Sequence, residues 1–329
     1  PVDVILTGTG SAVVGSIPAN TDGSGVISID LTDTTAEALT VGFEVDSTAG
    51  SNTTSVTFVA GAASAANSVI STTADNAVAD GVNTNTVEVL VRDANNNPVV
   101  STTVAVTLTG TAGASFGSIP PDTDASGLIS VDLTDTTAEA LTVGFTVDAV
   151  AGSNTTPVTF VAGAAVKLVF GEQPGNTVAG AVIAPAIKVE IQDALGNLVT
   201  TATDNVNLAF DNNPGGLGTL LGTLSKPAVG GVATFDDISV DEIGSGYTLR
   251  ATAGGLTNGI SNAFDVTPRA VLTVVISNGV DSVTVGTTST YFVSVRNDGP
   301  GDLTIANGGG VFIEINGDEG IDNLHLGNT

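Results

Sequence analysis

The chain contains an internal repeat of about 100 residues, and no other feature of the sequence constrains the fold as strongly. Residues 4–63 align with residues 106–165 without a gap, and about three quarters of the aligned positions are identical. A third, more divergent copy begins near Ala164. Because each copy is long enough to bury a core of its own, the repeat predicts a string of small domains rather than one large core.

The residue pattern within each copy predicts β-strands. Val87, Val89 and Val91 occupy alternate positions, and residues 187–192 (Ile-Lys-Val-Glu-Ile-Gln) alternate in the same way. The 41 glycines and the scarcity of Lys, Arg and Gln disfavour long helices. About seven short strands in roughly 100 residues are typical of an immunoglobulin-like sandwich. We therefore predict an all-β fold of tandem immunoglobulin-like β-sandwiches in an elongated array.

The repeat also predicts the division into domains. The first copy lacks the counterpart of residues 86–92, so we expect it to hold only the C-terminal part of an Ig-like domain. The last segment has no obvious closing strand, which predicts a partial Ig-like domain. Two complete Ig-like domains lie between them, and the predicted ranges are 1–61, 62–163, 164–268 and 269–329.

The composition excludes several classes of partner and chemistry. The sequence has 34 acidic and 7 basic residues, a formal net charge of −27, so we expect no nucleic acid held through its phosphates. It has no cysteine, which leaves no thiol for disulfide, metal or redox chemistry. Its apolar runs are shorter than the roughly 20 residues of a membrane helix, so we expect no membrane insertion within this segment.

Several motifs give most of the chain a family resemblance. The complete copies carry a turn at residues 93–99 or 193–199, an Asp-x-x-Gly turn at residues 124–127, and a closing strand at Phe160 or Phe264. In these features, residues 1–268 resemble the bacterial Ig-like repeats of the invasin and intimin type. The third copy has Tyr247 in a sequence that looks like the tyrosine corner of Ig-type sandwiches.

The last segment of the chain resembles a different family. Residues 286–291 (Gly-Thr-Thr-Ser-Thr-Tyr) and 295–300 (Val-Arg-Asn-Asp-Gly-Pro) are similar to a second Ig-like repeat family of prokaryotic surface proteins. This resemblance covers about residues 269–329.

Both resemblances imply a structural role outside the cell. Such modules mostly act as spacers, so we expect a non-enzymatic structural or adhesive stalk segment of a large secreted prokaryotic surface protein. The expected partners are other surface proteins or copies of the chain itself, with an adhesion target outside this segment. The alternative is a self-assembling subunit of an extracellular filament or surface layer, built by strand complementation.

Calcium is the cofactor that the sequence favours most. Asp122, Asp124 and Ser126 place oxygen atoms at alternate positions before a glycine, as in the first half of a calcium loop, and Asp22 and Ser24 repeat the pattern. The position of the usual bidentate Glu holds leucine in both copies, at Leu133 and Leu31, and no helices are predicted beside the loop. The competing interpretation is a plain hairpin turn.

Two further patterns carry weaker hypotheses. Asn52 and Asn154 begin glycosylation sequons at the same position of the repeat, and the competing interpretation is a polar turn before the last strand. The single histidine, His325, has no partner motif, so we expect no catalytic site.

Overall fold

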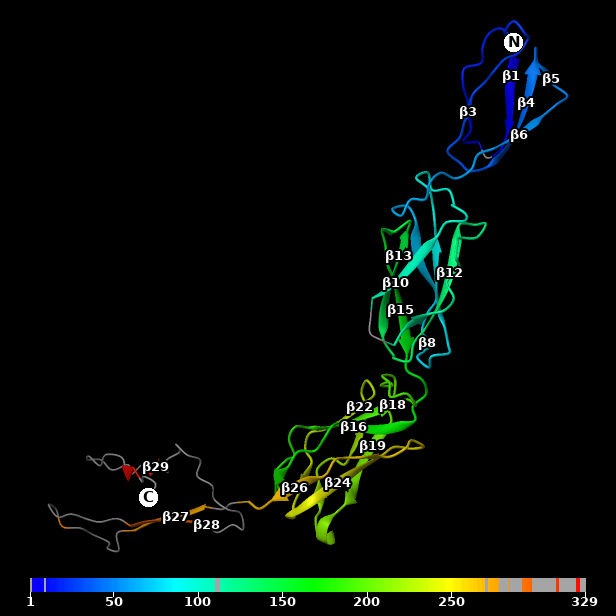
Figure 1. Ribbon diagram of the computed structural model, residues 1–329. Helices are drawn as coiled ribbons and strands as arrows, with labels where there is room; N and C mark the ends of the chain where they lie inside the picture. The colour runs from blue at the N-terminus through cyan, green and yellow to red at the C-terminus, as the bar shows by residue number, and fades with distance from the viewer. Residues whose placement is uncertain are drawn as a thin grey trace. The chain divides into compact units, whose positions relative to one another are not determined.

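The computed structural model describes residues 2–8, 10–109, 113–269, 272–277, 284, 292–297, 312–313 and 324–325. These residues form β-strands and connecting turns, with one short 3-10 helix, η1 (Pro214–Gly216). The chain separates into two compact units, Pro1–Ala164 with Asp193–Val199 and Ala165–Gln192 with Thr200–Thr329. Figure 1 labels many of their strands. The predicted all-β fold is confirmed, whereas the four domain ranges stay a prediction.

The second repeat forms a two-layer sandwich within the first unit. One sheet has the strand order β10-β13-β15-β8, with β14 paired to β13, and the other has the order β11-β12-β9-β7. The strands are β7 (Val69–Ala74), β8 (Ala77–Val78), β9 (Asn85–Leu90), β10 (Val104–Thr109), β11 (Ser115–Phe116), β12 (Leu128–Thr134), β13 (Ala140–Val147), β14 (Val150–Ala151) and β15 (Thr156–Val161).

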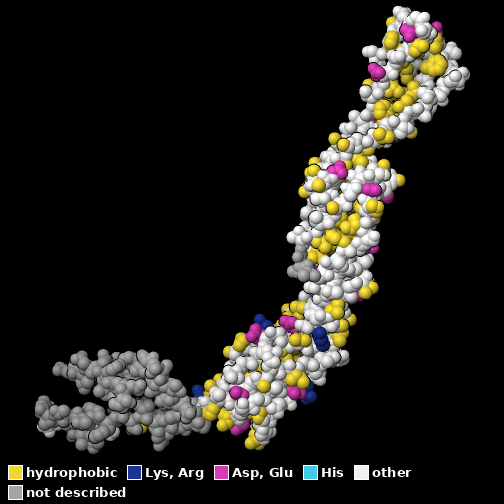
Figure 2. All heavy atoms as spheres, in the orientation of Figure 1, with side chains coloured by type: hydrophobic (Ala, Val, Ile, Leu, Met, Phe, Trp, Pro, Cys, Tyr) yellow, Lys and Arg dark blue, Asp and Glu magenta, His cyan; other side chains and the backbone are white. Residues whose placement is uncertain are grey.

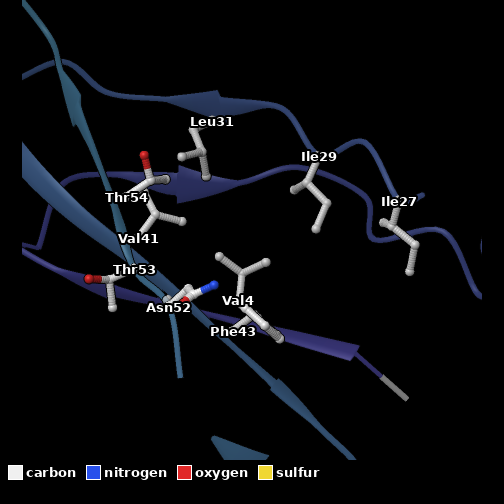
Figure 3. Close-up of a pocket in the computed structure, with 10 residues that line it drawn as sticks. Val4, Ile27, Ile29, Leu31, Val41, Phe43, Asn52, Thr53 and Thr54 are labelled. Carbon is white, nitrogen blue, oxygen red and sulfur yellow. The ribbon is translucent and has the colours of Figure 1, made fainter. Parts of the chain in front are cut away.

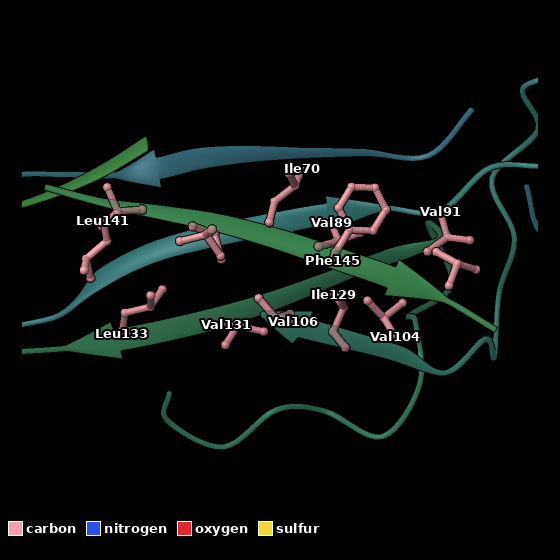
Figure 4. Close-up of a cluster of buried hydrophobic side chains, with 14 of the residues drawn as sticks. Ile70, Val89, Val91, Val104, Val106, Ile129, Val131, Leu133, Leu141 and Phe145 are labelled. Carbon is pink, nitrogen blue, oxygen red and sulfur yellow. The ribbon is translucent and has the colours of Figure 1, made fainter. Parts of the chain in front are cut away.

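The core of this sandwich follows from the alternation in its strands. Val87 and Val89 on β9 and Val143 on β13 are fully buried, whereas the residues between them are not. Figure 4 shows the apolar side chains of both sheets pointing into the space between them. Burying each such side chain contributes roughly 1.5–3 kcal/mol to folding, so the alternate apolar positions explain why the two sheets pack against each other.

The first repeat has the same strand order but fewer strands. Its strands are β1 (Val2–Thr7), β2 (Val13–Val14), β3 (Leu31–Thr32), β4 (Ala38–Val45), β5 (Thr48–Ala49) and β6 (Thr54–Thr57). β4 pairs with β1, β5 and β6, and β2 pairs with β3. Val4 lies opposite Phe43 in the same register that places Val106 opposite Phe145.

The second unit contains the third copy of the repeat. Its sheets have the orders β16-β18-β22 and β17-β26-β24-β19-β21, with β25 paired to β24 and a separate β20-β23 pair. The strands are β16 (Lys167–Glu172), β17 (Thr177–Val178), β18 (Ile187–Gln192), β19 (Asn205–Asn212), β20 (Leu220–Leu221), β21 (Ser225–Pro227), β22 (Val232–Phe235), β23 (Ser239–Val240), β24 (Gly244–Thr252), β25 (Gly259–Ile260) and β26 (Phe264–Thr267).

Tyr247 has the geometry that the sequence predicts for a tyrosine corner. Its side chain is fully buried, and its hydroxyl donates a hydrogen bond to the backbone oxygen of Glu242 over 3.0 Å. Its ring lies 5.4 Å from the ring of Phe210 and 5.8 Å from that of Phe264, measured between centroids. The tyrosine therefore joins the core of this copy to a loop at its edge.

Two antiparallel strand pairs are described after Thr267. They are β27 (Leu272–Ser277) with β28 (Phe292–Asn297), and β29 (Phe312–Ile313) with β30 (Leu324–His325). Residues 286–291, which carry part of the predicted resemblance of this segment, lie outside the described residues. No helix in the described part of the chain has the length and apolar character needed to cross a membrane.

Candidate functional site

The predicted calcium loop of the second repeat is the hairpin before β12. Asp124 Oδ1 accepts hydrogen bonds from the backbone N–H groups of Ser126 at 2.8 Å and Leu128 at 2.9 Å. Gly127 adopts a φ of 73° and donates its N–H to the backbone oxygen of Asp124 at 3.0 Å. Asp122 does not take part in these turn-closing bonds. Its Oδ1 accepts a hydrogen bond from the hydroxyl of Thr103 at 3.1 Å.

The first repeat copies this hairpin. Asp22 Oδ1 accepts the N–H groups of Ser24 at 2.8 Å and Val26 at 2.9 Å. These two bonds stabilise the charged carboxylate and lower the pKa of Asp22. In both copies one carboxylate oxygen closes the turn, which is what the hairpin interpretation requires.

Calcium binding at these hairpins stays a prediction. Within the residues that the structure describes, no group of three or more His, Cys, Asp or Glu side chains is placed to hold a metal ion. A calcium ion usually takes six to eight oxygen ligands, so water and backbone oxygens would have to supply most of them here.

A second pair of turns makes more hydrogen bonds than the two hairpins do. The first linker turn, residues 93–97, follows β9 and is built around Asp93, which is 2% exposed. Asp93 Oδ1 accepts the N–H groups of Asn95 at 2.8 Å and Asn97 at 2.9 Å, which closes the turn. Asp93 Oδ2 accepts the N–H of Gly61 at 2.8 Å, in the segment that connects the first and second repeats.

Asn97 extends this turn to the first repeat. Its Oδ1 accepts the N–H of Ala36 at 2.9 Å, and its Nδ2 donates to the backbone oxygen of Thr34 at 2.9 Å. The same Nδ2 also donates to Asp93 Oδ2 at 3.0 Å. One turn of the second repeat therefore binds both the connecting segment and the loop between β3 and β4.

The second linker turn, residues 193–197, repeats these contacts within the first compact unit. Asp193 Oδ2 accepts the N–H of Gly163 at 2.9 Å and Asn197 Nδ2 at 3.0 Å. Asn197 Oδ1 accepts the N–H of Ala138 at 2.9 Å, and its Nδ2 donates to the backbone oxygen of Thr136 at 3.0 Å. Two turns that lie 100 residues apart thus make the same set of hydrogen bonds.

The carboxylates of both turns are held in the charged form. Burial raises the pKa of Asp93, but the Asn97 amide and the backbone N–H groups of Gly61, Asn97 and Asn95 outweigh burial and lower the pKa to about 2. Burial also raises the pKa of Asp193, but the Asn197 amide and the backbone N–H groups of Gly163, Asn197 and Gly196 outweigh burial and lower this pKa. A buried carboxylate with four donors is therefore stabilised as an anion without a basic partner.

Asn154 is a third polar side chain with a structural role. Its Oδ1 accepts the N–H of Ile70 at 3.2 Å, and its Nδ2 donates to the backbone oxygen of Ile70 at 2.8 Å. The sequon asparagine of the second repeat thus binds β7 from the segment just before β15. Its amide nitrogen is engaged with the protein backbone, as in the polar-turn interpretation.

The sequence motifs indicate no role for the side chains of Asn97 and Asn197, and for Asn154 they indicate only a sequon or a polar turn. The signals that could have found them are the recurrence of Asp and Asn four residues apart in two divergent copies and the repeated position of Asn154. Their partners lie 59 to 84 residues away along the chain, so a local pattern could not identify them.

Comparison with known protein families finds a match within the second repeat. Residues 67–161 match the model of the bacterial Ig-like domain (group 1). This part of the chain is similar to bacterial Ig-like domains. The matched range includes the first linker turn, the hairpin with Asp122 and Asp124, and the Asn154 contact, and over this range the match confirms the resemblance predicted from the sequence.

Solved structures similar to the chain include three bacterial proteins. FdeC, an Escherichia coli adhesin, is 20% identical with a TM-score of 0.49, and the alignment covers 80% of this chain and 85% of FdeC. InvD of Yersinia pseudotuberculosis is 15% identical with a TM-score of 0.48, covering 80% and 87%. Invasin, a bacterial integrin-binding protein, is 18% identical with a TM-score of 0.42, covering 90% of this chain and 60% of invasin. A comparison with curated proteins finds no match.

Proposed function

We propose that this chain is a non-enzymatic stalk segment of a secreted prokaryotic surface protein. In this role the Ig-like repeats act as spacers, and the linker turns limit the bending between consecutive repeats. The adhesion target lies outside this segment, and the chain itself contacts other surface proteins or copies of itself. The place of action is the cell surface.

The single observation that carries the proposal is the set of contacts made by Asp93 and Asn97. A spacer must hold its two ends at a defined distance from each other. A connecting segment without contacts would let consecutive repeats rotate freely and would not fix that distance. The bonds to Gly61, Ala36 and Thr34 tie one repeat to the end of the repeat before it. Each bond contributes about 1 kcal/mol, and the set acts on one short segment.

The recurrence of these contacts in the second linker turn supports a role at each connection between repeats. The second linker turn keeps Asp193 and Asn197, although the residues between them change from Ala-Asn-Asn to Ala-Leu-Gly. The proposal therefore assigns the two polar positions to the connection between repeats and leaves the intervening residues free to vary.

The composition favours a structural role over a catalytic one. The sequence has one histidine and no cysteine, which removes two of the side chains that most often act as a general base or a nucleophile. The net charge of −27 favours a solvated chain that does not associate with other anionic surfaces.

The proposal is tested by removing the side chain of Asn97 in the full chain. In Asn97→Ala, hydrogen exchange at the amides of Gly61 and Ala36 is expected to rise about ten-fold, because the loss of roughly 1–2 kcal/mol of local contacts raises the population of the open form. Residual dipolar couplings would report a broader distribution of angles between the first and second repeats.

Asn95→Ala is the matched control, because Asn95 is exposed and lies in the same turn. Only its backbone N–H contacts Asp93, so this variant is expected to keep wild-type exchange and couplings. Unchanged couplings in Asn97→Ala would contradict the proposed role of the linker turn. Small-angle scattering of the full chain tests the predicted elongated array, which a compact particle would exclude.

A further inference from the structure

One outer face of the second repeat carries a row of apolar side chains. Val69 on β7 lies opposite Leu90 on β9, and Leu90 lies opposite Leu128 on β12. The residue next to each of them along its strand is buried in the core, so the row points to the solvent side of the sheet. Val69 is 42% exposed, and the two leucines are half-buried. Apolar residues scattered singly over a surface are ordinary, whereas a contiguous row is a candidate contact surface.

The apolar groove of the first repeat is a different kind of surface. This groove has a volume of about 370 Å³, and Figure 3 shows Val4 and Val41 among the residues that line it. Their counterparts in the second repeat are Val106 and Val143, which are buried between the two sheets. The groove therefore belongs to the core side of its sheet, whereas the apolar row of the second repeat belongs to an outer face.

Arg92 lies next to this row, two residues after Leu90 and on the same side of the chain. It is half-buried, and its Nε is buried without a hydrogen-bond acceptor. Within the described residues, Arg92 forms no ion pair with an Asp or Glu side chain. Its terminal N–H groups are therefore available to a carboxylate from another molecule, which a guanidinium binds in a bidentate geometry.

The third repeat carries a carboxylate at the equivalent place. Glu190 takes the position that Leu90 has 100 residues earlier in the chain. It lies opposite Val169 on β16 and opposite Val232 on β22. Its Oε2 accepts a hydrogen bond from Gln192 Nε2 at 2.8 Å, and no Lys or Arg in the described part of the chain forms an ion pair with it. The third repeat thus has a carboxylate between two valines where the second has a leucine.

The distribution of charge favours contact between these two faces. Arg92 is the single Lys or Arg among residues 1–164. In the face that Figure 2 shows, the dark blue side chains of Lys and Arg lie over the second compact unit, which holds the third repeat. There Lys167 and Lys188 lie on the same outer face as Glu172 and Glu190, and these four charges cancel. The repulsion between two chains of net charge −27 is therefore reduced where this face approaches Arg92.

We propose that the outer face around Arg92 of one chain binds the outer face around Glu190 of a second copy. The Arg92 face consists of Val69, Leu90, Arg92 and Leu128, and the Glu190 face consists of Val169, Glu190 and Val232. Arg92 pairs with Glu190, and the apolar side chains of both faces pack around this pair and shield it from water. Since the two faces differ, each chain can bind one copy through its second repeat and another through its third. The inference rests on the proposed stalk role, which sets neighbouring chains side by side, and it names one surface through which they make contact.

A contact of this size is weak between two chains in dilute solution. Each face has three or four residues, whereas a stable interface has roughly 20–30 residues on each side. Chains held at one surface share a high local concentration, so a weak contact can connect neighbours there. The experiment must therefore detect a short-lived contact between copies.

Paramagnetic relaxation enhancement detects such contacts, and the absence of cysteine from the sequence allows a single nitroxide label. Ser71→Cys places the label at an exposed position of β7, beside the Arg92 face. The labelled chain is mixed at roughly millimolar concentration with a second sample of the chain that carries ¹⁵N and no label, so every enhancement arises between copies. We expect enhancement at the amides of the Glu190 face. Thr107→Cys places the label on β10 of the other sheet and is expected to leave these amides unchanged.

Two variants of the labelled chain test the charge pair. Arg92→Gln introduces the residue that the third repeat has at this position, Gln192, so the variant is expected to fold. It is expected to lower the enhancement at Glu190 about ten-fold, because a bidentate charge-assisted contact is lost. Lys226→Gln is the matched control, since it removes the same charge but its Nζ bonds Asp236 Oδ1 of its own chain at 2.9 Å. This control is expected to keep the wild-type enhancement.

Charge reversal identifies the partner residue. A labelled Arg92→Glu chain is expected to lose the enhancement when it is mixed with the wild-type ¹⁵N chain, because two carboxylates then face each other. The same labelled chain is expected to regain most of the enhancement with a ¹⁵N Glu190→Lys chain, because the pair is restored with its charges exchanged.

Each outcome of these mixtures decides the proposal. Enhancement at the Glu190 face that follows the substitutions supports it. No enhancement, or enhancement that Arg92→Gln leaves unchanged, overturns it. Enhancement at a different surface would assign another occupant to the Arg92 face and would also overturn it. The stalk role is tested separately by exchange at Gly61 and Ala36 in Asn97→Ala, so either proposal can fail alone.

Discussion

The N–H of Gly61 donates to Asp93 Oδ2 over 2.8 Å. In the second linker turn, 100 residues further along the chain, Asp193 Oδ2 accepts the N–H of Gly163 over 2.9 Å. In both cases a buried carboxylate binds the segment that leads into its own repeat. That carboxylate accepts four hydrogen bonds and has no basic partner. We therefore expect the stability of the turn to depend on the carboxylate charge, and to change with mutation and with acid.

The first prediction concerns the charge of Asp93. Its pKa is lowered to about 2, so its stabilising effect is complete above the ordinary aspartate pKa of roughly 4 and is lost as the pH falls through about 2. We expect Asp93→Asn to cost about 1–3 kcal/mol at pH 7 and to flatten the loss of stability between pH 4 and pH 2. Urea unfolding, followed at the amides of the second repeat, measures both effects.

Asp80→Asn serves as the control for this variant. Asp80 also accepts two backbone N–H groups, from Val82 and Asn83 at 2.8 Å each, but it is exposed and its carboxylate bonds residues of its own turn. A similar cost at both positions would argue against a special role of the linker turn.

The second prediction uses a pair of aspartates with opposite pKa shifts. Asp135 is 1% exposed, and burial raises its pKa. The hydrogen bond from the backbone N–H of Thr137 lowers this pKa but does not outweigh burial. The hydroxyl of Ser11 lowers the pKa of its counterpart Asp33, and Gly113 stands in the place of that serine in the second repeat. At neutral pH the negative charge is therefore unfavourable at Asp135 and favourable at Asp33.

Asp135→Asn is accordingly expected to stabilise the second repeat at pH 7, whereas Asp33→Asn destabilises the first. The sign follows from linkage: a raised pKa gives stability below the ordinary value that is lost as the pH rises through the folded pKa. Thermal unfolding at pH 3 and pH 7 checks this, and the gain from Asp135→Asn should be absent at pH 3. A loss of stability at pH 7 would contradict the prediction.

The third prediction compares the same substitution in two repeats. Phe145→Ala removes a side chain that is 3% exposed and should cost about 3–5 kcal/mol. Phe43→Ala removes one that is 41% exposed and should cost about 1 kcal/mol, because much of its surface is already in water. Hydrogen exchange within β13 and β4 measures the two repeats separately in one chain, and equal costs would mean that the Phe43 face is covered in solution.

The fourth prediction concerns calcium at the hairpins. Millimolar calcium is expected to raise the melting temperature above that in NaCl of equal ionic strength, because a divalent ion neutralises acidic turns more than screening does. Asp124→Ala should remove part of the gain, and Asp80→Ala should not. An identical melting temperature with calcium, with chelator and with matched NaCl would leave the hairpins as plain turns.

The sequence by itself determined the repeat, the all-β class and the local turns. Alternation at Val87 and Val89 predicts a strand because successive side chains point to opposite faces. Asp124 and Gly127 predict a hairpin because all the groups that close it lie within five residues. The candidate calcium residues could be found in the same local way, and so could the tyrosine corner at Tyr247.

Only the tertiary structure decided which of these patterns became complete elements and which side chains connect them. Residues 26–32 and β12 have nearly the same sequence, yet β12 is a strand of seven residues and its counterpart a strand of two, because β9 lies beside one and not the other. Asn97 binds Ala36 across 61 residues, a contact that no local spacing encodes. Strand pairing and long-range hydrogen bonds depend on partners that the fold brings together, so their outcome follows from the whole chain rather than from the segment that takes part in them.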